Sequence, residues 1–388
     1  MTRFIALIIT GVIIMCTTEA CIRTYAESKQ TDSQLSGSAG KLDSKNYPGT
    51  EVMQKMTVSE HLSMYWQFFF SGRHRTPDEA LPQEKVHVAE LLSKNRDQLK
   101  AAWLGHSTLL IAIDGYTVLT DPVFEQRISL VGPTSFHKDF PLEVEDLPHV
   151  DVVIISHDHY DHLNAYSIRK LADKTDVFVV PSGVGARLAE WGIRREKIVE
   201  LDWWQEYALD EHLTLAATPA QHFSGRGLTD RNETLWASWA ILGQNHRVFF
   251  SGDSGYFDEF KQIGRKYGPF DTTFIECGAY NEKWSGIHMF PEQTVLAHRE
   301  LGGKILQPIH CATFNLSLHP WYEPMERLIA AAGSGGVTTS TPVMGRIVDY
   351  AAFQPTFQPA FQLQDHWWKP AMARSLRRVN PQLATADR

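Results

Sequence analysis

The chain has 388 residues, of which 43% are hydrophobic, so it is long enough for a large core and for roughly one to three domains. Its formal net charge is −8, and its densest basic run, Arg374–Arg378, lies close to the C-terminus. A protein that holds a polyphosphate backbone needs a cationic surface, so we expect no nucleic-acid partner. The same charge weakens electrostatic attraction to an anionic lipid surface but leaves apolar docking open.

The first residues have the pattern of an export signal. Arg3 precedes the apolar run Phe4–Met15, and Thr17–Ala20 supplies the small residues of a cleavage site. The apolar run is shorter than the roughly 20 residues that cross a bilayer. Cys21 then stands where bacterial lipoproteins carry their acceptor cysteine, so residues 1–21 are a signal peptide or a lipoprotein leader. We expect an exported protein of the bacterial cell envelope that is membrane-associated or lipid-anchored at Cys21, with a periplasmic location or an uncleaved anchor as alternatives.

Three segments flank the main domain. Residues 22–51 are rich in Ser, Lys, Asp and Gly and predict a flexible linker. Residues 52–100 form an N-terminal extension, whose aromatic cluster Met64–Phe70 either caps the core or faces a membrane. Residues 351–388, rich in Pro, Gln and aromatic side chains, predict a peripheral C-terminal tail.

The main domain, 101–350, is predicted to begin with a β-hairpin. An Asp-Gly pair separates the apolar runs 109–113 and 116–120, and Asp-Gly is a strong signal for a two-residue hairpin turn. Further apolar runs alternate with helical segments, of which 164–174 and 291–301 are examples. This order favours two sheets sandwiched between outer helices.

The most informative stretch is His-Asp-His-Tyr-Asp-His at 157–162. It directly follows 151–156, an apolar and β-branched run that predicts a buried strand. Imidazoles and carboxylates that are packed so closely at a strand end can be divided between two adjacent metals. The division that the spacing favours is His157 with His159, and Asp161 with His162.

Further candidate ligands each follow a predicted strand. They are His222 after 213–218, Asp253 after 247–252 and His310 after 304–309. Two first-row metals take roughly seven to nine ligands between them, so ligands from other strand ends are needed to complete the set. Histidine and carboxylate ligands suit zinc, and also iron or manganese.

In this order of ligands the chain resembles the metallo-β-lactamase fold superfamily, and within it the branch of N-acylphosphatidylethanolamine-hydrolysing phospholipase D and its bacterial relatives. The resemblance extends from Trp103 to Phe314. Its particular marks are WLGHST at 103–108, LTDPVF at 119–124, ELDWW at 200–204, FFSGDSGY at 249–256, GAY at 278–280 and HCATF at 310–314. It implies an α/β fold, a four-layer αββα sandwich of two mixed sheets flanked by helices.

The resemblance also implies roles for the candidate ligands. One zinc ion is held by His157, His159 and His222, the other by Asp161, His162 and His310, and Asp253 bridges both. Asp161 and Asp253 are in addition candidates to orient the nucleophile.

Other polar residues are candidates for supporting roles. Asp121, at the end of a predicted strand, either accepts a hydrogen bond from a ligand histidine or caps a turn. His106 and Tyr280 are candidates for the rim of the site. His288 is a candidate catalytic residue that protonates the leaving alkoxide or binds the head group, unless it only flanks a helix.

The chain departs from the animal enzyme of this branch in two places. Glu276 and Cys277 stand where that enzyme is apolar, and the segment 282–287, ahead of His288, is particular to this chain. Both places lie near where the substrate would approach, so they bear on the substrate more than on the metals.

The activity that the resemblance implies is phospholipase D-type hydrolysis of N-acylphosphatidylethanolamine to N-acylethanolamine and phosphatidic acid. Two adjacent divalent metals would lower the pKa of water and stabilise the charge that develops on a phosphodiester. One alternative is a metal-dependent lactonase or another ester or β-lactam hydrolase. A second is a metal-binding envelope lipoprotein without turnover. We expect a phospholipid or other phosphodiester substrate and a membrane surface as partner, and the residues favour no particular oligomeric state.

Overall fold

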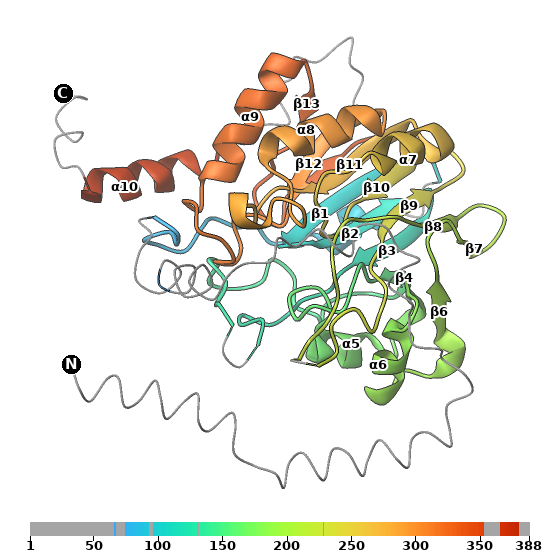
Figure 1. Cartoon of the computed structure of the whole chain (residues 1–388). Helices are drawn as coiled ribbons and strands as arrows, with labels where there is room; N and C mark the ends of the chain where they lie inside the picture. Colours follow the sequence, from blue (N-terminus) through green and yellow to red (C-terminus); the bar gives the residue numbers. More distant parts are fainter. Residues whose placement is uncertain are drawn as a thin grey trace, which may run out of the picture. The chain divides into compact units, whose positions relative to one another are not determined.

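Two β-sheets with helices on their outer faces form the part of the chain that a computed structural model describes (Figure 1). The described residues are 66, 74–92, 96–129, 132–227, 229–352 and 365–379. The predicted leader, 1–21, and linker, 22–51, lie outside them, as does the aromatic cluster Met64–Phe70 apart from Trp66.

Each described sheet has seven strands and is mixed in direction. The first has the order β14-β1-β2-β3-β4-β5-β6, with β1 Leu99–Gly105, β2 Thr108–Ile113, β3 Tyr116–Thr120, β4 Val150–Ile154, β5 Thr175–Pro181, β6 Ile198–Leu201 and β14 Ile347–Asp349. The second has the order β13-β12-β11-β10-β9-β8-β7, with β7 Glu206–Ala208, β8 Thr214–Thr218, β9 Ser238–Leu242, β10 Arg247–Phe250, β11 Phe270–Glu276, β12 Gly303–Ile309 and β13 Thr338–Thr339. In both, antiparallel pairs earlier in the chain are followed by parallel pairs, so the two sheets are built alike.

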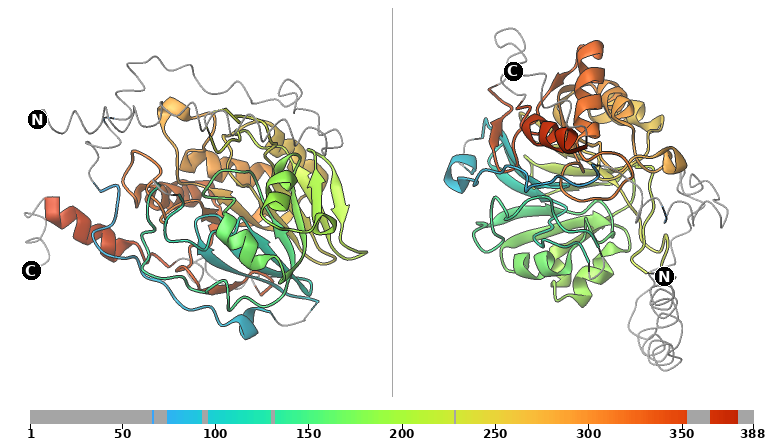
Figure 2. Two further views of the ribbon diagram at one scale, coloured as in Figure 1. Left: turned by 90° about the horizontal axis from the view of Figure 1, so that it is seen from below. Right: turned by 90° about the vertical axis from the view of Figure 1, so that its left-hand side faces the viewer.

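Five of the described helices pack on the outer faces of the two sheets (Figures 1 and 2). The first sheet carries α5 Ala165–Leu171 and α6 Val184–Glu190, and the second carries α7 Glu259–Tyr267, α8 Pro291–Glu300 and α9 Glu323–Gly335. The remaining helical elements are α4 Val88–Leu91, η2 Arg195–Lys197, η3 Glu282–Trp284 and α10 Lys369–Val379. None of the described helices combines the length and the apolar character that crossing a membrane requires.

Strand β2 is apolar from Leu109 to Ile113, and both of its faces are buried. In β2, Leu109, Ile111 and Ile113 pack into the cluster between the two sheets. Leu110 and Ala112, which point the other way, pack into the cluster beneath α5 and α6. A strand that is buried on both faces shows a continuous apolar run in place of an alternating pattern. The predicted four-layer αββα sandwich is therefore confirmed.

The hairpin between β2 and β3 has the predicted turn. Asp114 and Gly115 have φ angles of 50° and 92°. A turn with two positive φ angles matches the right-handed twist of the paired strands, which explains the preference for Asp-Gly there.

Segments predicted to lie outside the main domain contribute to its core. Leu81 and Leu91 of the N-terminal extension are buried, and β1 already begins at Leu99. Trp368, within the predicted tail 351–388, is 0% exposed and packs in the cluster between the sheets. The predicted peripheral position is therefore wrong for Trp368. Burial of its large indole ring stabilises this position, although the segment as a whole is not rich in apolar residues.

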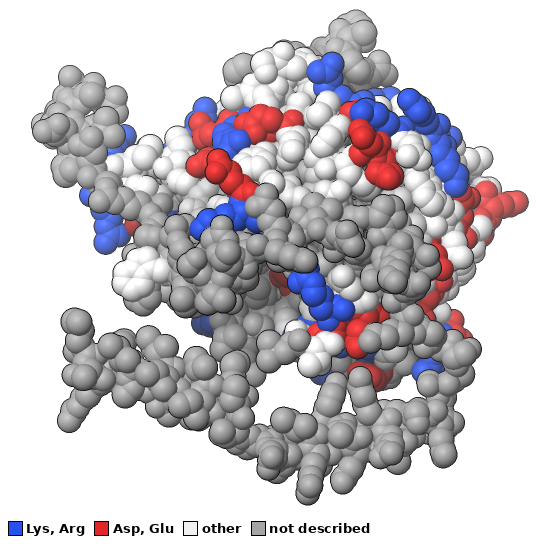
Figure 3. All heavy atoms as spheres, viewed as in Figure 1, with Lys and Arg blue, Asp and Glu red and all other residues white. Residues whose placement is uncertain are grey.

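The described surface carries charges of both signs. On the face drawn in Figure 3, Lys and Arg side chains are interspersed with Asp and Glu side chains.

We expect Trp368→Ala to lower the free energy of unfolding by about 3–5 kcal/mol, because the change removes a buried indole and leaves a cavity. Urea unfolding measures the difference, with Tyr166→Ala at an exposed position as the control. An unchanged unfolding midpoint for Trp368→Ala would contradict the packing of this segment on the core.

Candidate metal centre

The predicted ligands lie in loops that follow strands of both sheets. The histidine-rich loop 157–162 follows β4, and His222, Asp253 and His310 follow β8, β10 and β12. The structure brings their side chains into two groups, and within each group the candidate ligand atoms lie within 4.8 Å of one another. The first group is His157, His159, His222 and Asp253, and the second is His106, Asp161, His162 and His310.

Asp253 lies between the two groups. Its Oδ2 atom is 3.7 Å from His222 Nε2 and 3.9 Å from His157 Nε2, which belong to the first group. The same oxygen is 3.2 Å from Nε2 of both His162 and His310, which belong to the second. One carboxylate oxygen therefore faces both groups, which is the position that the sequence suggested for a bridging ligand.

Several buried atoms of the two groups have no hydrogen bond. Among the described residues, His162 Nε2, His310 Nε2 and Asp253 Oδ1 have no hydrogen-bond partner. His157 Nε2 and His159 Nδ1 are 2.7 Å apart, a contact between nitrogen atoms that needs a proton or a cation between them. Buried polar atoms are normally satisfied, so these converging nitrogen and oxygen atoms fit divalent cations that would displace any protons on them. Imidazole and carboxylate donors suit zinc, iron or manganese.

Asp158, a residue of the histidine-rich loop, attaches this loop to other parts of the chain. Its carboxylate is fully buried, accepts a hydrogen bond from Gly225 N at 2.7 Å and pairs with Arg187 Nε at 3.0 Å. Asn164 then caps α5 by accepting a hydrogen bond from Ser167 N at 2.8 Å. Asp158 stands out in the sequence only as a member of the hexad, and its bracing role was not predicted.

Non-glycine residues at the site adopt left-handed backbone conformations. The φ angles are 50° at His106, 35° at Asp121 and 59° at His310. Each such conformation costs roughly 1–2 kcal/mol and persists only where neighbouring contacts impose it. Here His310 N donates to His106 O at 3.0 Å, and Trp103 Nε1 donates to the same oxygen at 2.9 Å. Strain of this kind is concentrated at functional sites.

Asp121 lies where an orienting carboxylate was predicted. It is 0% exposed, and its Oδ2 atom is 2.7 Å from His162 Nδ1. Ser156 donates to the same carboxylate through its N atom and its Oγ atom, both at 2.6 Å. On the other side of the site, His222 Nδ1 is 2.9 Å from Ile287 O. These partners leave Nε2 of His162 and of His222 facing the two groups, which is how supporting residues usually orient metal-binding histidines.

Burial keeps several of the site histidines neutral. It lowers the pKa of His157 and His222 well below the usual value. Burial, together with the charge on His310, lowers the pKa of His106 to about 3. Neutral imidazole is the form that binds metals, so these side chains are ready to act as donors.

Other site groups are charged despite their burial. Burial lowers the pKa of His162 and His310, but the negative charges of Asp253 and Asp161 outweigh it. They raise the pKa of His162 well above its usual value and that of His310 to about 10. Burial raises the pKa of Asp253 and Asp161, yet the positive histidines hold both well below the usual range. Without metal, protons on two histidines balance the two carboxylates.

The remaining predicted site residues lie in different surroundings. His106 Nε2 is 3.0 Å from Asp161 Oδ2, so this residue is part of the second group and not only of its rim. His288 contacts His222 and His310 through its ring, with centroid distances of 5.1 and 5.3 Å.

The Tyr280 hydroxyl is already occupied, because it donates to Glu323 Oε1 at 2.9 Å. Burial, followed by the charge of Glu323, raises the pKa of Tyr280. Its ring stacks on His319, with a centroid distance of 4.2 Å. These contacts give Tyr280 a packing role among the described residues.

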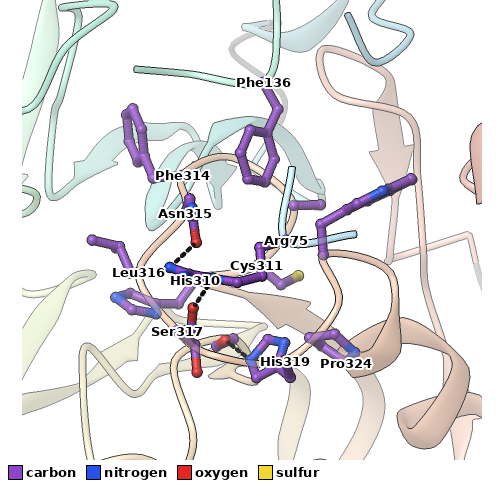
Figure 4. Close-up of a pocket in the computed structure, with 13 residues that line it drawn as sticks. Arg75, Phe136, His310, Cys311, Phe314, Asn315, Leu316, Ser317, His319 and Pro324 are labelled. Atoms are coloured by element: carbon purple, nitrogen blue, oxygen red, sulfur yellow. Dashed lines mark hydrogen bonds between the residues drawn. The ribbon is translucent and has the colours of Figure 1, made fainter. Parts of the chain in front are cut away.

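The loop after His310 is held by the N-terminal extension. A small pocket beside His310 is lined by this loop, with Phe136 and Phe314 on one side and His319 on another (Figure 4). Arg75 is buried there and donates from Nε to Ser317 O at 2.9 Å and from one terminal nitrogen to Asn315 Oδ1 at 3.0 Å. Arg75 thus joins the extension to the loop that begins at a candidate ligand.

Comparisons with known proteins found similar chains. The family model of the beta-lactamase superfamily domain matches residues 116–311. An uncharacterized protein of Mycobacterium tuberculosis is 49% identical over 280 residues, which cover 70% of this chain and 72% of that protein. N-acyl-phosphatidylethanolamine-hydrolyzing phospholipase D 1 of Caenorhabditis elegans is 35% identical over 266 residues, 65% of this chain and 74% of that protein.

A solved structure supports the fold. The isothiocyanate hydrolase from Delia radicum gut bacteria superposes with a TM-score of 0.52 at 18% identity, covering 64% of this chain and 98% of that chain. At this identity the similarity is one of fold.

We expect metal binding to release protons, because the raised pKa values leave His162 and His310 protonated in the metal-free protein at neutral pH. Metal affinity should therefore rise with pH, and about two protons should leave per protein molecule at pH 7. Calorimetric titration in buffers of different ionisation enthalpy measures the number. Heats that do not depend on the buffer would contradict this protonation pattern.

We expect Asp121→Asn to weaken metal binding by about 10- to 100-fold, because the amide no longer provides the carboxylate that orients His162. Competition with a chelator measures the affinity. Glu196→Gln, at an exposed ion pair with Arg194, is the control and should bind metal as the unaltered protein does. Equal affinities in both variants would assign Asp121 to turn capping.

Proposed function

The chain belongs to the metallo-β-lactamase superfamily and is a metal-dependent hydrolase of that fold, and from this premise we propose that it hydrolyses a phosphodiester of a membrane lipid. The family predicted from the sequence motifs is confirmed. The proposed reaction is phospholipase D-type cleavage of N-acylphosphatidylethanolamine, which yields N-acylethanolamine and phosphatidic acid.

The observation that carries this proposal is the pair of ligand groups that share one oxygen of Asp253. We assign one zinc ion to each group, held by His157, His159 and His222, and by Asp161, His162 and His310, with Asp253 between them. Two divalent cations so placed supply an activated water and stabilise the negative charge that develops on a phosphodiester. The 35% identity to a phospholipase D that hydrolyses N-acylphosphatidylethanolamine supports this substrate.

Apolar side chains beside both groups support a lipid as the substrate. The ring of Phe223 contacts those of His159 and His222, with centroid distances of 4.5 and 4.7 Å. Phe314 lies beside His106 on the other side, at 5.3 Å. Both phenylalanines are partly exposed, so they offer apolar surface next to the reacting centre.

Positive charge next to this apolar surface suits an anionic phospholipid. The Arg231 guanidinium lies over the Phe223 ring, 4.5 Å from its centroid. A phosphodiester brings a negative charge to the site, and a cation at the rim lowers the cost of its approach.

The chain's own side chains then complete the reaction. Asp161 lies in the second group, Asp253 faces both groups, and both carboxylates orient the nucleophile. His288 lies against His222 and His310, where it protonates the leaving alkoxide. An anchor at Cys21, outside the described residues, would keep the enzyme beside its lipid.

We expect the purified protein to release N-acylethanolamine from vesicles that contain N-acylphosphatidylethanolamine, and a chelator to abolish the release. Asp161→Asn and His159→Ala should each reduce the rate to background, because each removes a ligand from one group. Mass spectrometry of the products measures the rate. His149→Ala, at an exposed histidine, is the control and should keep full activity.

Full activity of both ligand variants would rule out this site as the catalytic centre. Turnover of lactones, β-lactams or soluble esters without turnover of the lipid would replace the phosphodiester with another substrate class. Metal binding without turnover of any of these would identify a metal-binding envelope protein.

A further inference from the structure

Glu276, at the end of β11, is a buried carboxylate whose contacts differ from those of the metal-binding groups. It is 0% exposed, and its Oε1 atom accepts hydrogen bonds from Met289 N at 2.9 Å and Ser254 N at 3.4 Å. The same oxygen is 3.2 Å from His288 Nδ1. Its Oε2 atom is buried and has no hydrogen-bond partner in the described part of the chain.

Stability alone does not explain a carboxylate at this position. Burying a carboxylate oxygen without a partner costs free energy, and an apolar residue would avoid that cost. A buried carboxylate that lowers the stability of the fold is a candidate for a functional role.

Glu276 and the segment 282–287 meet at His288. Glu276 contacts the ring of this residue, and the segment leads directly into it. Glu276 bonds the first residues after that segment, whereas Ile287 O is bonded to His222 Nδ1 at 2.9 Å. The end of segment 282–287 is thus attached to a candidate ligand through Ile287, and the two residues that follow it are attached to Glu276.

His288 is in turn close to the reacting centre. One of its ring nitrogens belongs to a group with Asp253 and His310 in which the candidate ligand atoms lie within 4.8 Å of one another. Its ring stacks on that of His310 with an interplanar angle of 28°. The orientation of this ring therefore decides which nitrogen faces a substrate.

We propose that Glu276 is a positioning residue that fixes the ring orientation and the tautomer of His288. An ionised carboxylate only accepts hydrogen bonds, so Nδ1 of His288 carries the hydrogen that is donated to Glu276. Nε2 is then the nitrogen that faces the substrate. A second proton held on Nε2 is the one that passes to the leaving alkoxide, after which His288 keeps only the hydrogen on Nδ1. This inference rests on the proposed function, in which His288 meets the leaving oxygen of the phosphodiester.

The test is a double-mutant cycle with Glu276→Gln, His288→Ala and the double variant, in the metal-loaded protein on vesicles of N-acylphosphatidylethanolamine. We expect Glu276→Gln to lower kcat by about 10-fold or more with little change in KM, because the reacting group is misoriented and the substrate still binds. In the His288→Ala background the same change should have no further effect. A merely structural role would give the same loss in both backgrounds and would overturn the proposal, as would an unchanged kcat in Glu276→Gln alone.

Thr294→Val is the matched control. The Thr294 hydroxyl donates to the backbone O of Glu276 at 2.8 Å and does not contact its carboxylate. This variant should keep kcat, and metal content and melting temperature are measured for every variant. If Glu276→Gln does not fold, nitrogen-15 NMR of the imidazoles in the unaltered protein decides the question, with His288→Ala used to assign the signal. A hydrogen on Nε2 of His288 in place of Nδ1 would overturn the proposal.

Failure of the proposed function gives a different result. In that case the unaltered protein does not hydrolyse the lipid. The affinity of the same four proteins for inorganic phosphate is then measured in place of kcat. Weaker phosphate binding in Glu276→Gln only when His288 is present would support the positioning role independently of the substrate. Equal weakening in both backgrounds would reject it.

Discussion

The burial of many imidazole and carboxylate groups at one place is the constraint on which the rest of this structure depends. Polar atoms without partners are costly in a protein interior, and a cluster of them is stable only if charges compensate one another. Here two protonated histidines balance Asp161 and Asp253 in the absence of metal. Divalent cations can take the place of those protons, so the arrangement is suited to holding metals.

The sandwich makes this concentration of polar groups possible. Strands that are apolar on both faces form a rigid core, so the loops after β4, β8, β10 and β12 are held at defined positions. The strained backbone of His106 and His310 shows that contacts between distant parts of the chain, and not local preference, determine where these side chains point.

Residues outside the sequence motifs of the family connect the candidate site and the core to other parts of the chain. Arg75 joins the N-terminal extension to the loop after His310, and Trp368 brings the C-terminal segment into the core. Glu276 joins the end of β11 to His288. The contacts of Arg75 and Glu276 therefore reach residues next to the candidate ligands, whereas Trp368 stabilises the core.

The strands, the hairpin and the candidate ligands could be predicted from the residues alone. They follow from short-range patterns, namely continuous apolar runs, an Asp-Gly turn and histidines placed just after strands. The folded arrangement was needed to show that Asp253 faces both groups, that Tyr280 is bonded to Glu323, that Glu276 reaches His288 and that Trp368 is buried. Those facts depend on how distant segments pack on two twisted sheets, and a local pattern of residues does not encode which side chains will then become neighbours.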